Sequence, residues 1–281
     1  MTLLMLKLVL APALVVGSSL AGRRWGPRVT GTLVTFPIVA GPILLITHLE
    51  HGARFLTAAA SASLLGLVSL ALFAAVFAVL SRTRSWPVAL LVGWSACLAA
   101  DLPLSAFTLH PAAGLCLALA AIGVTVATLP RAEGPAGGVT EVSPPWWDLP
   151  ARAVATAVLV LILTSAAARL GPGLTGVLAP FPIATSVVAA FALAQGGPAA
   201  TIATVRGVLH GLVGFAVFCF LVAVTAEQLG GIAFAIATAG ALGAQLVVER
   251  VRAVRRGRVP GGGTPHGAVS SVMRREAGND H

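Results

Sequence analysis

The chain has 281 residues, of which 57% are hydrophobic and only 10% are charged, and its mean hydropathy is +0.95. Because a soluble domain carries roughly 25% charged residues, this composition excludes an ordinary soluble protein and predicts that a lipid bilayer surrounds most of the exterior. The net charge of +9 does not indicate nucleic-acid binding, since the basic residues gather at the ends of apolar runs, as cytoplasmic membrane anchors do.

Apolar runs of the length that crosses about 30 Å of hydrocarbon follow one another along the chain. The predicted spans are 3–21, 29–48, 54–80, 86–106, 110–129, 151–168, 174–195, 199–225 and 229–249. We expect the first run to be retained as a helix, although the small residues at 17–19 leave cleavage open. The long run 86–130 is divided because polar residues and prolines interrupt its centre, namely Asp101, Pro103, His110 and Pro111. The predicted fold is all-α and polytopic, with about nine transmembrane helices.

A stretch near the N-terminus recurs 145 positions later. Gly-Pro-x-x-Thr-Gly followed by Phe-Pro-Ile occurs at 26–31 and 36–38, and again with the same spacing at 171–176 and 181–183. Apolar composition alone would not align both landmarks in register, so the sequence indicates an internal duplication.

An odd number of predicted spans, five, separates the two copies, so they enter the membrane from opposite sides. We therefore expect two inverted-topology repeats. The predicted parts are a first repeat of five spans at 1–130, a cytoplasmic linker at 131–150, a second repeat of four spans at 151–250, and a basic, disordered cytoplasmic tail at 251–281. The arginine clusters place the N-terminus outside and the C-terminus in the cytoplasm. An Arg-, Ala- and Gly-rich composition favours a bacterial inner (plasma) membrane.

Interrupted helices at equivalent places in two inverted halves point to a central binding site. A mid-span proline frees backbone carbonyls that lipid tolerates only beside protein or a water-filled cavity. The residues expected to line the site are Phe36, Pro37, Gly41, Pro42, Phe181, Pro182, Thr185, Ser186, Arg206 and His210. A duplicated kink that only shapes packing is an equally weighted alternative.

Ionisable residues inside spans are candidate functional groups. Arg206 lies one turn before His210 on the same face, and Gly207, Gly211 and Gly214 allow a neighbouring helix to approach closely. This face could meet an anionic headgroup or carry a proton through His210. Alternatively, Arg206 extends to the cytoplasmic interface and His210 bonds a backbone carbonyl.

The remaining candidate groups are weaker. Asp101 is the one carboxylate at plausible hydrocarbon depth, and we expect it at the outer boundary beside His110. The turn at 48–51 carries metal-capable side chains, but too few to predict a metal site. With no nucleotide-binding loop, zinc-protease motif or nucleophile elbow in the sequence, we expect no cofactor, no metal and no enzymatic activity; a membrane enzyme acting on lipid is a minor alternative.

The repeated unit consists of an N-terminal helix, the motif Arg23-x-x-Gly26-Pro27, a proline-interrupted span and a long third helix. With this unit, residues 1–81 and 151–249 resemble two copies of the small GlpM-like bacterial inner-membrane proteins. The resemblance implies membrane placement and carries over no site residue. The repeat favours a transporter or permease for an unidentified small solute. The expected partners are the bilayer and that solute, without nucleic acid and with homo-oligomers left open. Scarce polar residues within the spans favour the alternative, a non-transporting assembly or regulatory protein that binds lipid or a partner protein.

Overall fold

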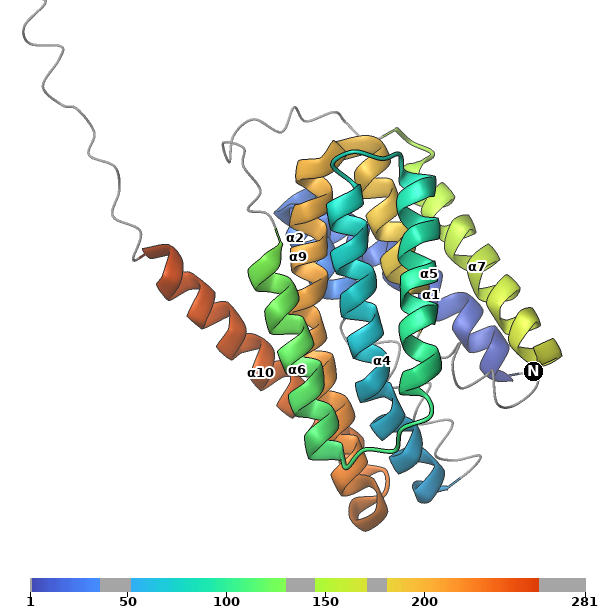
Figure 1. The fold of residues 1–281 in the computed structure, drawn as a ribbon, viewed down its shortest axis with the longest axis vertical. Coiled ribbons are helices and arrows are strands. Elements are labelled where there is room, and N and C mark those ends of the chain that lie inside the picture. The colour runs from blue at the N-terminus through green and yellow to red at the C-terminus, as the bar shows by residue number, and fades with distance from the viewer. Residues whose placement is uncertain (1, 36–51, 130–144, 171–180, 258–281) are drawn as a thin grey trace, which may run out of the picture. The chain divides into compact units, whose positions relative to one another are not determined.

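A computed structural model describes residues 2–35, 52–129, 145–170 and 181–257, and α-helices make up most of these ranges (Figure 1). The chain divides into two compact units, Met1–Gln245 and Leu246–His281. The helices are α1 (Thr2–Trp25), α2 (Pro27–Val34), α4 (Ala53–Leu80), α5 (Trp86–Leu104), α6 (Pro111–Thr128), α7 (Asp148–Leu170), α9 (Ile183–Leu229) and α10 (Ile232–Gly257).

Within the described ranges, five helices are long and apolar enough to cross a membrane: α4, α5, α6, α9 and α10. This agrees with a helical membrane protein. The boundaries of α4 match the predicted span 54–80, and the division of 86–130 into two helices is confirmed. Asp101 and Pro103 do not end α5, which continues to Leu104; the chain then turns before Pro111 begins α6.

The long helix α9 is broken at Gly197. Its φ of 69° and ψ of −168° lie outside the helical region, and the following residue is Pro198. The break separates a first arm, residues 183–196, from a second arm, residues 198–229, and Figure 1 shows the yellow-to-gold ribbon turning back here. The boundary predicted between spans ending at 195 and beginning at 199 is confirmed. At 1.5 Å per residue the first arm is only about 21 Å long.

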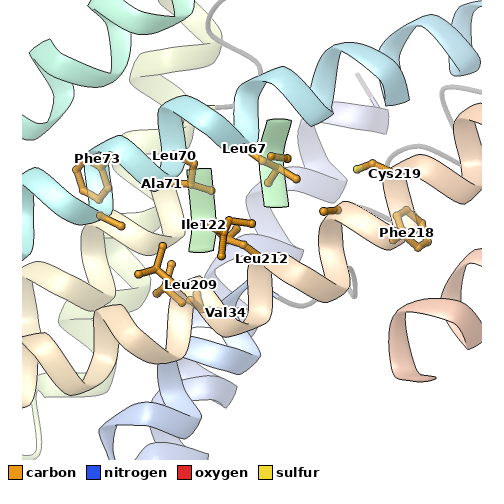
Figure 2. Close-up of a cluster of buried hydrophobic side chains, with 14 of the residues drawn as sticks. Val34, Leu67, Leu70, Ala71, Phe73, Ile122, Leu209, Leu212, Phe218 and Cys219 are labelled. Carbon is orange, nitrogen blue, oxygen red and sulfur yellow. The ribbon is translucent and has the colours of Figure 1, made fainter. Parts of the chain in front are cut away.

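Helix α4 and the second arm of α9 form the centre of the core. Figure 2 places Phe73 toward the same end of this pair as Leu209, and Leu67 toward the same end as Phe218. The two helices therefore run in opposite directions. Their contact face consists of fully or almost fully buried apolar side chains, among them Leu64, Leu67, Phe73, Leu209, Leu212 and Phe218.

Helix α2 packs on the second arm at backbone contact distance. A Cβ added at Gly31 would lie 2.0 Å from the carbonyl oxygen of Thr204, and one added at Gly207 would lie 2.0 Å from that of Arg28. The Thr32 hydroxyl also donates to the Gly207 carbonyl at 3.2 Å. The close approach predicted at the glycines of the eighth span is confirmed, because only glycine fits at such a crossing.

Outside this core, large apolar side chains cover the exposed faces of the helices. Leu91, Val124 and Leu246 are all exposed. Trp146 and Trp147, in the turn before α7, are exposed as well, as expected for aromatic side chains at a membrane–water interface.

Candidate functional site

Four of the ten predicted lining residues lie outside the described residues: Phe36, Pro37, Gly41 and Pro42. The other six fall into two groups, one where α9 begins and one on its second arm.

The first group surrounds the start of α9, in the interior of the protein. Pro182 is the N-cap of the helix, so the described part of the predicted span 174–195 becomes helical only after the proline. Phe181 is buried against the Trp94 ring, with ring centroids 5.4 Å apart. The Trp94 indole N–H donates to the Ser186 hydroxyl at 2.8 Å, and Thr185 is buried beside it. Trp94, which sequence reasoning missed, thus covers this helix start from α5.

The second group is on the second arm. Arg206 donates from Nη2 to the carbonyl oxygen of Leu129, just after α6, at 2.8 Å. His210 Nδ1 is hydrogen-bonded to the Arg206 carbonyl oxygen. The backbone bond foreseen as the alternative for His210 is therefore present. The two groups contact different helices, since Ser186 is hydrogen-bonded to Trp94 of α5 and Arg206 to Leu129 at the end of α6.

Asp101, which we expected at the outer boundary of the membrane, is buried between α5 and α4. Only 4% of it is exposed. Its Oδ1 is hydrogen-bonded to the Ser69 hydroxyl of α4, and the Cys97 thiol, one turn earlier on α5, donates to Oδ2 at 3.8 Å. Helix α5 continues past Asp101 to Leu104 and turns this side chain toward α4, while its depth in the bilayer stays a prediction. His110 instead lies exposed at the N-cap of α6, where it accepts a bond from the Ala112 N–H.

A second buried carboxylate joins three segments that are far apart in sequence. Asp148, at the start of α7, accepts bonds from Arg23 of α1 at 2.9 Å, from Arg152 at 2.9 Å and from the Gln195 amide at 2.6 Å. The side chain of Asp148 is 1% exposed. Burial acts to raise the pKa of the Asp148 carboxyl, but Arg23, Arg152 and Gln195 outweigh it and lower the pKa below its usual value.

We name these four residues, Arg23, Asp148, Arg152 and Gln195, the Asp148 network. The network was not predicted from the sequence. The two arginines were interpreted only as basic residues flanking spans. The sequence did contain one indication that these residues could meet. The end of the first span, the linker and the turn near 196–198 are all predicted on the cytoplasmic side of the membrane. The guanidinium of Arg152 also lies 4.7 Å from the Phe191 ring centre, in a cation–π contact with the first arm.

One further polar side chain stands out in the second half. The amide nitrogen and oxygen of Gln245, on α10, are buried and make no hydrogen bond within the part of the chain that the structure describes. Gln245 Oε1 lies against the second arm, 3.1 Å from where a Cβ on Gly214 would be.

Neither metal chemistry nor similarity to other proteins adds to this picture. Over the described ranges, no three His, Cys, Asp or Glu side chains are grouped to hold a metal ion, and the turn at 48–51 lies outside them. Comparison with protein-family models, curated proteins and solved structures finds no match for this chain.

Proposed function

We propose that the protein is a transporter of the bacterial plasma membrane, built from two inverted-topology repeats with about nine spans in all. Its N-terminus is outside and its C-terminus is cytoplasmic. A small solute binds near the bilayer midplane where the second and seventh spans are interrupted, at Pro37 and Pro182, and moves by alternating access.

The backbone conformation supports the repeat at two glycines that lie beyond the Gly-Pro-x-x-Thr-Gly and Phe-Pro-Ile motifs. Gly52 precedes α4 with φ 82° and ψ 175°, and Gly197, 145 positions later, precedes the second arm with φ 69° and ψ −168°. Positive φ is readily available only to glycine. Two helices thus begin at equivalent positions through the same backbone conformation.

The directions of equivalent helices carry the proposal. Helix α4 and the second arm correspond at the 145-residue offset, and they pack together in opposite directions (Figure 2). Their buried residues also correspond: Leu64 with Leu209, Leu67 with Leu212, and Phe73 with Phe218. Helices α1 and α7 also correspond, and the bond from Arg23 near the end of α1 to Asp148 at the start of α7 supports an antiparallel arrangement there as well.

Polar side chains from non-equivalent positions approach equivalent points of α4 and of the second arm. Asp101 of α5 reaches Ser69 on α4, and Gln245 of α10 lies against Gly214. Gly214 is the residue 145 positions after Ser69. Each central helix is therefore met by one polar side chain at the same point of the repeat.

This symmetry and the short first arm of α9 support the proposal of transport. Inverted repeats with discontinuous helices are a common architecture of secondary transporters, which rock one half against the other around a central site. Helix α9 begins after Pro182, inside the predicted span 174–195, and Thr185 and Ser186 lie in its first turn.

One observation favours the alternative, a non-transporting assembly or regulatory protein. The side chains of Ser186, Arg206 and His210 all bind groups of the protein itself. Polar side chains that are already hydrogen-bonded within the protein suit a structural role better than the binding and release of a solute.

Uptake into proteoliposomes tests transport. Vesicles containing the purified protein are incubated with a mixture of labelled small metabolites, and accumulation is compared with that in empty vesicles. We expect uptake of at least one solute class, and slower uptake with Pro182→Ala, which lets the helix extend through the break. Binding of a stoichiometric partner protein that is insensitive to Pro182→Ala, together with no uptake, would favour the alternative.

Thiol labelling tests the inverted repeats separately. Arg54 and Ala199 are exposed, lie 145 positions apart and flank the two equivalent helix starts. In a variant lacking the native cysteines, Arg54→Cys should react with a membrane-impermeant reagent added outside intact cells, and Ala199→Cys should react only after the membrane is opened. Labelling of both from one side contradicts inverted topology.

A further inference from the structure

We propose that Asp101 and Ser69 form a reversible proton-binding site between α4 and α5, and that the proton is the ion coupled to transport. Coupling rests on the proposed function; proton binding does not. The proposal stands on three observations: the surroundings of the carboxylate, the count of hydrogens around Ser69, and the position of Ser69 in the repeat.

Among the described residues, Asp101 is hydrogen-bonded to neutral groups and forms no ion pair. Its hydrogen bonds within the described residues come from a hydroxyl, Ser69, and a thiol, Cys97. Ion pairs in this part of the chain involve Asp148 and Glu249, not Asp101. A carboxylate taken out of water without a cation is strongly disfavoured, and it binds a proton instead.

The titratable groups on the neighbouring helices have other hydrogen-bond partners or positions. On α6 these are His110, which is exposed and caps the helix, and Cys116, which is exposed. On α9, Arg206 binds the Leu129 carbonyl, His210 binds the Arg206 carbonyl, and Cys219 is a buried thiol. Within the described residues, the hydrogen bonds of Asp101 are made with Ser69 and Cys97.

The hydrogens around Ser69 can be counted. Its hydroxyl lies within hydrogen-bond distance of two acceptors, Asp101 Oδ1 and, at 3.0 Å, the Gly66 carbonyl oxygen. A hydroxyl has one hydrogen and can donate to only one of them. If Ser69 donates to Gly66, the bond between Ser69 and Asp101 needs a hydrogen from Asp101. Protonated Asp101 therefore allows both of these hydrogen bonds to be made at once.

Two hydrogen-bond patterns follow, and they differ by one proton. With Asp101 protonated, Oδ1–H donates to Ser69 Oγ, and Ser69 donates to Gly66. With Asp101 ionised, the Ser69 hydroxyl turns and donates to Oδ1. The O–H bond of Asp101 forms with a proton taken from water on one side of the membrane, and it breaks when that proton returns to water on the other side. No other reactant is needed.

A sodium ion fits these surroundings poorly. Hard cations of this kind are held by several oxygen ligands. One oxygen of Asp101 faces the thiol hydrogen of Cys97 and the other faces Ser69. A proton needs only one of these oxygens.

The position of Ser69 links the site to movement of the two halves. Ser69 is on α4, the helix of the first half that packs along the second arm of α9 at the centre of the core. The equivalent residue of the second half is Gly214, and the residue equivalent to Asp101 is Leu246. The site therefore exists once per chain, on one of the two helices whose contact must change in alternating access.

Infrared spectroscopy of the protein in lipid vesicles tests proton binding directly. We expect the C=O band of a protonated carboxylic acid to persist at neutral pH, where exposed carboxyls, with pKa values of about 4, are ionised. The chain has only three aspartates, Asp101, Asp148 and Asp280. Carboxyl-labelled ¹³C-aspartate should shift the band, which assigns it to an aspartate without any substitution.

Variants complete the assignment. Asp101→Asn should abolish the band, and Glu227→Gln, a matched change at an exposed carboxylate, should leave it intact. Ser69→Ala should shift the band, because the acceptor of the Asp101 hydrogen is lost. Absence of the band from the wild type, no shift with labelled aspartate, or a band retained in Asp101→Asn overturns the proposal.

The coupling is tested in the uptake assay by imposing a pH gradient across the vesicles. We expect the gradient to accelerate wild-type uptake several-fold and to have no effect on Asp101→Asn. A sodium gradient that accelerates wild-type uptake while a pH gradient does not contradicts proton coupling. The band without uptake would refute the transport function and leave proton binding intact; uptake without the band would refute the site and leave transport intact.

Discussion

The structure contains two buried aspartates whose surroundings differ in kind. Asp148 is surrounded by two guanidinium groups and an amide, all of which donate hydrogen bonds to a charged carboxylate. Asp101 has a hydroxyl and a thiol, both neutral. Both aspartates are buried, but the cationic donors around Asp148 stabilise a charged carboxylate, whereas the neutral groups around Asp101 favour a protonated acid.

The difference also separates two roles. The Asp148 network joins the end of α1, the start of α7 and the end of the first arm of α9, so it fixes three segments to each other. Asp101 connects only α5 to α4 and adds little to their apolar contact. We expect the first aspartate to matter mainly for stability and the second mainly for function.

The same substitution at both sites gives the largest expected contrast. Asp148→Asn leaves two arginines, one of them largely buried, without their carboxylate, and should lower the free energy of unfolding by about 3 kcal/mol. Asp101→Asn resembles the protonated acid and should cost about 1 kcal/mol or less. Reversible unfolding of the purified protein in detergent measures both. Equal losses would mean that Asp101 is held as a charged group.

Acid should remove the contribution of Asp148. The pKa of this carboxyl is lower in the folded protein than in the unfolded chain, where it is about 3.9. Its stabilisation is therefore complete above that value and is lost as the pH falls toward the folded value. In unfolding measurements across this range, the gap between the wild type and Asp148→Asn should close at low pH. A gap that stays constant would show that Asp148 does not titrate in this way.

The two arginines should differ by their exposure. The side chain of Arg152 is 10% exposed and that of Arg23 is 33% exposed. Arg152→Gln should cost about 2 kcal/mol, because it disrupts a largely buried pair. Arg23→Gln should cost about 1 kcal/mol or less, because solvent screens the more exposed pair. Equal effects of the two variants in the same unfolding assay would contradict this ranking.

The smallest expected effect on stability is at Ser69. Ser69→Ala removes one hydroxyl from the α4–α5 contact and should cost about 1 kcal/mol, while it shifts the infrared band of Asp101. Ser81→Ala is a matched control, since Ser81 is also buried near the end of α4 but bonds only the Ala78 carbonyl. A band shift of the same size in the control would remove the assignment to Ser69.

Helix positions were predictable because they depend on local signals. Apolar run lengths located α4, and Gly197-Pro198 marked the break in α9, since glycine and proline end helices through their own backbone properties. The close crossing at Gly207 was predictable for the same reason, because a lack of side chain is visible in the sequence.

Side-chain partners were less predictable, because they depend on which helices become neighbours. Arg23 and Asp148 are separated by 125 positions, and nothing local to either residue indicates the other. The burial of Asp101 depends on the direction in which α5 faces α4, and the long apolar run around it has no polar face to show that direction. Trp94 was missed for the same reason: in the sequence it is one more apolar residue.

Helix α6 has a consequence beyond its own contacts. The positions 145 residues after α6 fall in the basic C-terminal segment, so α6 has no counterpart in the second half. Most of its side chains are not buried, and only Ala118 and Ile122 of its apolar residues lie in the core. In the proposed topology, however, α6 makes the number of crossings between the copies odd. Without it, both copies would insert in the same orientation and the symmetry axis would lie along the membrane normal. One peripheral helix thus decides the symmetry class in the proposed topology.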